Sequence, residues 1–138
     1  MKKRIIYLTN TDYDRIRNII RALKNKNLPN RDQIYEFETE LNFANITDSE
    51  NIPTNIITLN TKVKIKNIST DNGFVYSIVL PKDANIKEGK ISILAPLGLA
   101  LIGHEAGSIV KYKTEAGVYD YFIEEILYQP ESKGIYTL

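Results

Sequence analysis

Apolar residues change their spacing about a third of the way along this chain of 138 residues. In the segment 8–25 they recur at intervals of three and four, which predicts an amphipathic helix with one apolar stripe. The stripe consists of Ile16, Ile19, Ile20 and Leu23. Either Asn10 or Thr11 can cap the start of this helix, because both side chains carry an oxygen that accepts from backbone N–H groups.

A second helix is predicted over residues 31–45, with Ile34, Phe37, Leu41 and Ala44 on its apolar side. The linker 25–31 holds only about six residues and includes Pro29, so we expect the two helices to pack antiparallel as a hairpin. Residues 1–31 carry nine basic and two acidic side chains, whereas residues 32–50 carry six acidic side chains and no basic one. A basic helix is therefore expected beside an acidic one, at ~0–1 kcal/mol for each exposed pair.

Beyond the polar segment 46–55 the apolar period becomes two, which is typical of half-buried strands. In the first strand, residues 56–68, alternate residues from Leu59 to Ile65 face one side and three lysines, Lys62, Lys64 and Lys66, face the other. Further strands are predicted over residues 74–81, 91–96, 108–113 and 118–129, and an extended tail follows. The order predicts an α+β chain: a hairpin over residues 1–50, then a mostly antiparallel sheet over residues 51–138 with one short helix.

Composition narrows the class of protein without naming a partner. The net charge is +1 and the chain has no cysteine, so neither a global attraction to nucleic acid nor thiol chemistry is expected. The least polar stretch, "APLGLALIG" at residues 95–103, is too short to cross a membrane and contains Gly98 and Gly103. The apolar run from Ile5 to Leu8 is too short for a signal peptide. We expect a cytoplasmic protein without a membrane segment.

Few side chains offer catalytic chemistry. His104 is the single histidine and has no adjacent nucleophile in sequence, and no cluster of residues has the spacing of metal ligands. Glu124 and Glu125 point to opposite faces of a strand, so they cannot act as a pair. We therefore predict no catalytic residue, no metal and no cofactor. The lysines of the first strand, with Lys111 and Lys113, form either a solvated face or a contact for nucleic acid or an acidic protein.

One segment resembles a known family. "ISILAPLGLALIGHEAGSIVKY", residues 91–112, is similar to the core signature of the Gre transcript-cleavage factors: a strand, a Ser/Ala-Pro turn, Leu-Gly-x-Ala-Leu-Leu-Gly, and a Gly-Asp turn into a second strand. Ile102 stands at the last leucine of that signature, and the Gly-Asp turn is Gly107-Ser108. "TLNTKVKIKN" and "LYQPESKGIYTL" resemble a short-hairpin branch of that superfamily, the regulator of nucleoside diphosphate kinase (Rnk) family.

The resemblance implies an FKBP-like domain that docks on bacterial RNA polymerase beside its secondary channel, in competition with Gre-type factors and without sequence-specific DNA binding. The implied docking residues surround the Ala-Pro turn: Leu94, Ala95, Pro96, Leu97 and Leu99. Leu94 stands where relatives commonly have an acid, and Leu99 where they have Lys or Arg. Docking at this turn is therefore expected to be apolar rather than ionic.

The hairpin tip departs from the cleavage factors, in which two acidic residues at the tip reach the catalytic Mg²⁺. The tip residues here are Lys26, Asn27, Leu28, Pro29, Asn30, Arg31 and Asp32, with a single acid. Helices of this length extend only ~21 Å. We therefore predict a transcription regulator without cleavage activity. Two alternatives stay open: a cleavage-stimulating Gre factor, and a prolyl isomerase suggested by the FKBP-like fold, although the aromatic residues form no cluster in the sequence.

Overall fold

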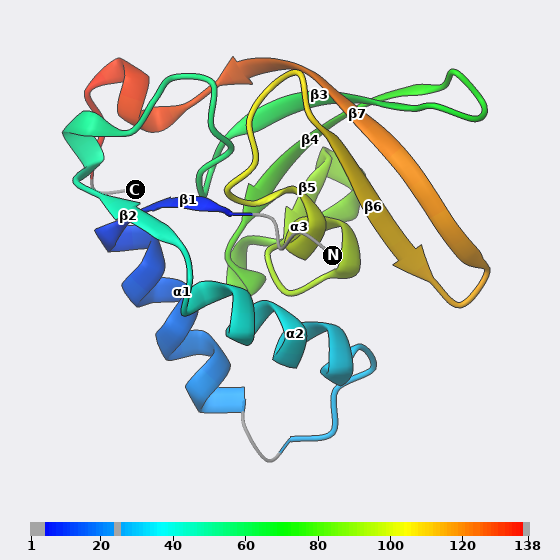
Figure 1. Ribbon diagram of the computed structural model, residues 1–138, viewed down its shortest axis with the longest axis horizontal. Coiled ribbons are helices and arrows are strands. Elements are labelled where there is room, and N and C mark those ends of the chain that lie inside the picture. Colours follow the sequence, from blue (N-terminus) through cyan, green and yellow to red (C-terminus); the bar gives the residue numbers. More distant parts are fainter. Residues whose placement is uncertain (1–4, 24–25, 137–138) are drawn as a thin grey trace.

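The computed structural model describes residues 5–23 and 26–136 and consists of a helical N-terminal part and a curved sheet (Figure 1). The N-terminal part runs β1 (Tyr7–Thr9), α1 (Asn10–Leu23), α2 (Arg31–Leu41) and β2 (Asn45–Thr47). The second part contains β3 (Lys62–Asn67), β4 (Gly73–Val79), β5 (Lys90–Ser92), α3 (Pro96–Leu101), β6 (Ile109–Thr114) and β7 (Gly117–Tyr128). The predicted α+β class is confirmed.

The main sheet has the strand order β5-β4-β3-β7-β6. Its central strand β3 is antiparallel to both neighbours, and Ile65 lies opposite Phe74 on one side and Ile123 on the other. The edge pair β4–β5 is parallel, with Ile78 opposite Ile91, so the sheet is mixed rather than wholly antiparallel. This difference arises because β4 and β5 are joined by a crossover of short 3₁₀ turns instead of a tight hairpin.

A short parallel pair, β1 and β2, closes the base of the helical hairpin and was not predicted. The backbone N–H of Tyr7 in β1 donates to the carbonyl of Gly103, at 2.9 Å, just beyond the end of α3. Gly103 has a φ of +78°, and a Cβ there would lie 2.7 Å from the Cβ of Ile6. The second glycine of the apolar stretch therefore allows β1 to approach α3 closely.

The cap of α1 differs from the prediction. The Thr9 hydroxyl accepts from the backbone N–H of Asp12 at 3.0 Å, so Thr9 performs the role expected of Asn10 or Thr11. The second helix also ends earlier than predicted, at Leu41, and Ala44 lies beyond it. In place of the expected extended tail, residues Pro130–Lys133 form a 3₁₀ turn.

One hydrophobic core joins the two parts of the chain. Three members of the predicted stripes, Ile19, Leu23 and Ala44, are only partly buried against the core. The other five, Ile16 and Ile20 of α1 and Ile34, Phe37 and Leu41 of α2, are buried. These five side chains belong to the same core cluster as the inward residues of β3 and β7. Helices of 14 and 11 residues are marginal alone in water, so both depend on this packing.

The lysine face of β3 is neutralised locally. Lys64 pairs with Glu124 at 3.8 Å, Lys66 with Asp71 at 2.9 Å, and Lys111 on β6 with Asp120 at 3.4 Å. The alternation of buried and exposed residues along β3 follows the prediction. Because three of the five lysines have acidic partners, this face favours the solvated interpretation over a contact for nucleic acid.

Candidate functional site

The start of α3 forms the turn that the sequence marked for docking, here called the rim (residues 94–99). Pro96 occupies the first turn of α3, where its missing N–H leaves no helical hydrogen bond unmade. Ala95 precedes it in an extended conformation, with φ −69° and ψ 152°, and its carbonyl accepts from the N–H of Leu99 at 2.9 Å. The Ser92 hydroxyl accepts from the N–H of Leu94 at 3.1 Å, which fixes the turn out of β5.

The five rim residues named from the sequence divide into two groups. Leu94, Leu97 and Leu99 are 9%, 8% and 7% exposed and belong to the core cluster. Ala95 and Pro96 are half-buried and have surface available to a partner. The leucines therefore support the turn from within, and the contact surface that the rim offers is centred on Ala95 and Pro96.

Gly98 explains why the rim has its shape. A Cβ at this position would lie 2.2 Å from the carbonyl oxygen of Ser92 and 3.0 Å from the Cα of Ile93. Only a residue without a side chain lets α3 lie this close to the end of β5. The Leu-Gly pattern thus sets the position of Pro96 relative to the sheet.

The hairpin tip (residues 26–32) lies against the rim instead of standing clear of the sheet. The Asn30 side-chain amide donates to the carbonyl of Leu94 at 2.7 Å, across 64 positions in the sequence. Just beyond the tip, the Gln33 amide donates to the carbonyl of Lys113 on β6 at 2.9 Å. In Figure 1, α1 and α2 diverge toward the tip, and α2 runs beside the sheet domain. The structure therefore brings together two sets of residues that the sequence placed separately.

A groove of about 660 Å³ opens between the tip and the end of β6. Residues 27–33 form one wall, and residues 112–115 with Pro96 form the other. The tip is thus held at two points and leaves a hollow between them.

The charged side chains of the tip point to solvent. Lys26, Arg31 and Asp32 are exposed, and the guanidinium of Arg31 lies 5.9 Å from the ring centre of Tyr35. Asp32 is the single acid of the tip, as the sequence indicated. Within the described residues, His, Asp and Glu side chains nowhere gather in the groups of three or more that would hold a metal ion.

Five aromatic rings form a cluster on the sheet beside this groove, which corrects the sequence-based expectation that the aromatics do not gather. The members are Phe74, Tyr76, Tyr112, Tyr119 and Tyr121, with neighbouring ring centres 5.8 to 6.4 Å apart. Alternation puts these residues on the same face from three strands, and the register brings them side by side. Burial raises the pKa of Tyr76 and of Tyr112, and Tyr112 also lines the tip groove.

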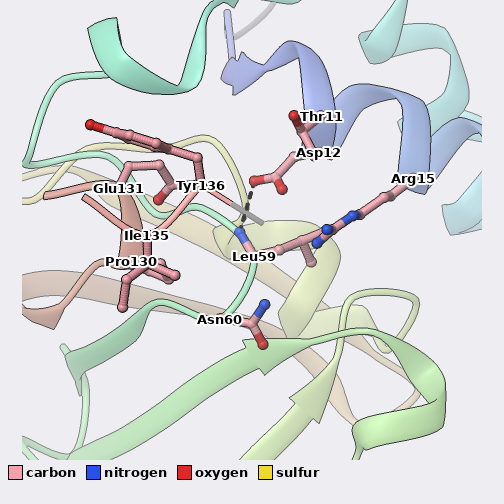
Figure 2. Close-up of a pocket in the computed structure, with 9 residues that line it drawn as sticks. All are labelled: Thr11, Asp12, Arg15, Leu59, Asn60, Pro130, Glu131, Ile135 and Tyr136. Atoms are coloured by element: carbon pink, nitrogen blue, oxygen red, sulfur yellow. Dashed lines mark hydrogen bonds between the residues drawn. The ribbon is translucent and has the colours of Figure 1, made fainter. Parts of the chain in front are cut away.

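A second, smaller pocket lies where α1, the loop before β3 and the C-terminal 3₁₀ turn meet (Figure 2). The Asp12 carboxylate is 3% exposed and accepts from the backbone N–H of Leu59 at 3.0 Å. Burial, with a smaller contribution from the nearby Glu131 carboxylate, raises the pKa of Asp12 to about 7. Arg15 and the Leu59 N–H oppose the shift but do not cancel it.

The C-terminal segment fastens the loop beneath this pocket. Thr58 donates to Glu131 at 2.7 Å and its hydroxyl lies 2.8 Å from that of Thr61. Gln129 is 1% exposed and its amide donates to the carbonyls of Pro53 and Ile56 at 2.9 and 2.8 Å. These bonds hold the segment between the helical part and the sheet in a single arrangement.

His104 serves the backbone in the turn after α3. Its carbonyl accepts from the N–H of Ile57 at 3.0 Å, and its own N–H donates to Leu101. Across residues 5–23 and 26–136, no helix combines the length and the apolar composition that crossing a membrane requires.

The sequence does not predict two of the residues described above: Gln33, which lines the groove at the tip, and Asp12, which lines the second pocket. Gln33 carries no local sequence signal, because its partner is 80 positions away. Asp12 had the signal of an acid in a first helical turn, which usually lies in solvent, and only the tertiary fold buries it.

Comparison with known proteins agrees with this architecture. Residues 52–128 match the family "Transcription elongation factor, GreA/GreB, C-term". The chain is 29% identical to the regulator of nucleoside diphosphate kinase of Escherichia coli K12 over the full length of both. It is 30% identical to transcription elongation factor GreA of Thermosipho melanesiensis, covering 89% of this chain and 97% of that one. A solved GreA/GreB elongation factor from Nitrosomonas europaea superimposes with a TM-score of 0.73 at 33% identity, covering 91% of this chain and all of that one.

Proposed function

Because this chain belongs to the GreA/GreB transcription elongation factor family, we propose that it binds bacterial RNA polymerase and regulates transcription without stimulating transcript cleavage. Its full-length similarity to regulators of nucleoside diphosphate kinase supports a regulatory role. The effect on that kinase would be indirect, through transcription. In this proposal the rim docks beside the secondary channel of the polymerase and excludes Gre-type factors from the same place.

The observation that carries the docking proposal is the half-buried Pro96 at the start of α3. Its neighbours Leu94, Leu97 and Leu99 are committed to the core, so the available contact at the rim is small, rigid and apolar. Such a contact suits an apolar side chain of the partner better than a charged one. Leu94 and Leu99 are apolar, and both side chains are buried. Neither of them therefore changes the surface that the rim offers to a partner.

The test is the variant Pro96→Glu. Glutamate is acceptable at a helix N-terminus, where the helix dipole favours an acid, so the fold should persist. The charge should weaken binding to core polymerase by about tenfold or more, because it must be desolvated in an apolar contact. Binding is measured by fluorescence anisotropy, and a labelled Gre factor should be displaced by the wild type but not by the variant.

Pro53→Glu is the matched control, since Pro53 is exposed in the loop before β3 and belongs neither to the rim nor to the lining of the groove. It should bind polymerase as the wild type does. Equal binding of the two variants would remove Pro96 from the docking surface. No binding of the wild type at micromolar concentration would remove the polymerase proposal itself.

The absence of cleavage activity follows from the tip. Asp32 is exposed beside Arg31, and the tip holds no second carboxylate to share a Mg²⁺. A hard divalent cation with one added carboxylate gains little over water ligands. Backtracked elongation complexes incubated with this protein should keep full-length RNA, as they should with Asp32→Asn. Shortened RNA with the wild type alone would assign Asp32 a cleavage role.

The ring cluster favours a second candidate, a prolyl isomerase, because such enzymes bind proline side chains on aromatic surfaces. Five half-buried rings on one sheet face provide the required surface chemistry. Fold alone does not carry the activity. A peptide isomerisation assay that stays at the uncatalysed rate would exclude this candidate.

A further inference from the structure

Asn30 occupies a position in which its side chain has two alternative uses. It is the N-cap residue of α2, and asparagine is among the residues preferred there because its side-chain oxygen can accept from the first free N–H groups. Here the side chain makes no capping bond, with φ −114° and ψ 40° at this residue. Its amide instead donates to Leu94 of the rim at 2.7 Å.

We propose that the tip is a latch, held closed over the rim by Asn30 and Gln33, and that a partner docking at Pro96 must displace it. The inference rests on the proposed function, because RNA polymerase is the partner that would compete with the tip. The closed tip occupies the carbonyl of Leu94 and forms one wall of the groove whose other wall includes Pro96. A protein surface broader than this groove cannot seat on Pro96 without overlapping the closed tip.

The latch is only partly packed, because Leu28 is the one tip residue whose apolar side chain lies half-buried against the core. Between its two hydrogen bonds lies the groove of about 660 Å³, where close-packed side chains would be expected in a permanent contact. The oxygen Oε1 of Gln33 is buried there without a hydrogen-bond partner within the described part of the chain. Closing the tip thus leaves one polar atom dehydrated, and opening it restores that atom to water.

The open state has a gain of its own. Once released from Leu94, the Asn30 side chain can cap α2 by accepting from backbone N–H groups of the first turn. The Asn30 side chain therefore has a hydrogen-bond partner in either state, which lowers the free-energy cost of opening. A partner with a modest preference for the open state can then shift the population.

The movement is confined to the tip. Ile34, Phe37 and Leu41 hold α2 in the core at 3%, 2% and 1% exposure. Opening therefore affects residues 26–30 and the first turn of α2, up to Gln33, and leaves α1, the rest of α2 and the sheet where they are.

Asn30→Asp isolates the latch. Aspartate has the same size and caps helices equally well, but it lacks the amide donor and places oxygen against the Leu94 carbonyl. Asn42→Asp is the matched control: Asn42 lies at the other end of α2, where its side-chain oxygen faces Arg17 at 3.4 Å. Both substitutions add one negative charge to the same helix.

The position of the tip is measured first, without polymerase. The chain has no cysteine, so spin labels can be placed at Asn27→Cys and Glu115→Cys, two residues on opposite walls of the groove. Asn30→Asp should shift the label distances to longer values, whereas Asn42→Asp should leave them as in the wild type. An unchanged distribution with Asn30→Asp would overturn the latch.

Affinity for core polymerase is measured next, in the unlabelled protein. Asn30→Asp should bind about three- to tenfold more tightly, the gain expected when one hydrogen bond no longer holds the closed state, and Asn42→Asp should not. Equal or weaker binding of Asn30→Asp, with a wild type that binds, overturns the competition and leaves the proposed function intact. If the wild type does not bind, the proposed function fails and the competition with it, whereas a response of the label distances still supports the latch.

Discussion

At the scale of single residues, Asp12 is the ionisable group with the most distinctive surroundings among those described. Its carboxyl group is buried, and its pKa rises from 3.8 to about 7 because the charged form is poorly solvated and lies near Glu131. A folded-state pKa above the unfolded one means that the folded protein binds the extra proton between these pH values. The contribution of Asp12 to stability is therefore fully present below about pH 4 and is lost as the pH rises through about 7.

Asp12→Asn should remove this part of the pH dependence. Asparagine keeps an oxygen to accept from Leu59 N–H but never ionises, so its free energy of unfolding should be nearly flat where that of the wild type falls by a few kcal/mol, at about 1.4 kcal/mol per pKa unit. Urea unfolding at several pH values between 4 and 8 measures both. Asp14→Asn, at an exposed neighbour, should retain the wild-type slope. A wild type that gains stability across this range would contradict the assignment.

At the scale of elements, α3 depends on one glycine for its seat against β5. Gly98→Ala puts a methyl group 2.2 Å from the Ser92 carbonyl, so the helix must shift, and we expect a loss of about 3 kcal/mol in the free energy of unfolding. Gly73→Ala is the control, because a methyl group there meets its nearest neighbour, the Ile65 carbonyl, at 3.8 Å. Urea unfolding of the two variants should separate them clearly. Equal losses would show that backbone freedom, not space, sets the need for glycine.

The elements also show which features a sequence can predict. Ile16, Phe37 and Val63 repeat with the period of their helix or strand, and the burial of each follows from that period alone. The strands β1 and β2 have three residues each, too few for a period, and they exist because Gly103 and Ile6 supply partners. The hydrogen bond from Asn30 to Leu94 is still harder to predict from the sequence, because it joins two turns whose residues share no pattern.

At the scale of the whole molecule, contacts distant in sequence make the two parts of the chain one structure. The division into residues 1–50 and 51–138 stays a prediction about modules, and the family match starts at residue 52. The core cluster nevertheless includes Ile20 and Phe37 from the first part with Ile65 and Ile123 from the second. A polar junction also connects the two parts: it is the pocket lined by Asp12, by the loop before β3 and by Glu131.

A shared core implies one unfolding transition, and Phe37→Ala tests it. The loss of a ring that is 2% exposed should lower the free energy of unfolding by about 3–5 kcal/mol. Far-UV circular dichroism reports mainly on the helices. The chain has no tryptophan, so the intrinsic fluorescence comes from its nine tyrosines, of which six lie beyond residue 51 and weight this signal toward the second part of the chain. Both signals should shift to lower urea together.

Phe43→Ala, at a ring that is 60% exposed, should change stability by roughly 0.5 kcal/mol or less. If Phe37→Ala released the helical signal while the tyrosine signal kept its wild-type midpoint, the hairpin and the sheet would be independent units, and the tip could then open by movement of the whole hairpin rather than of residues 26–33.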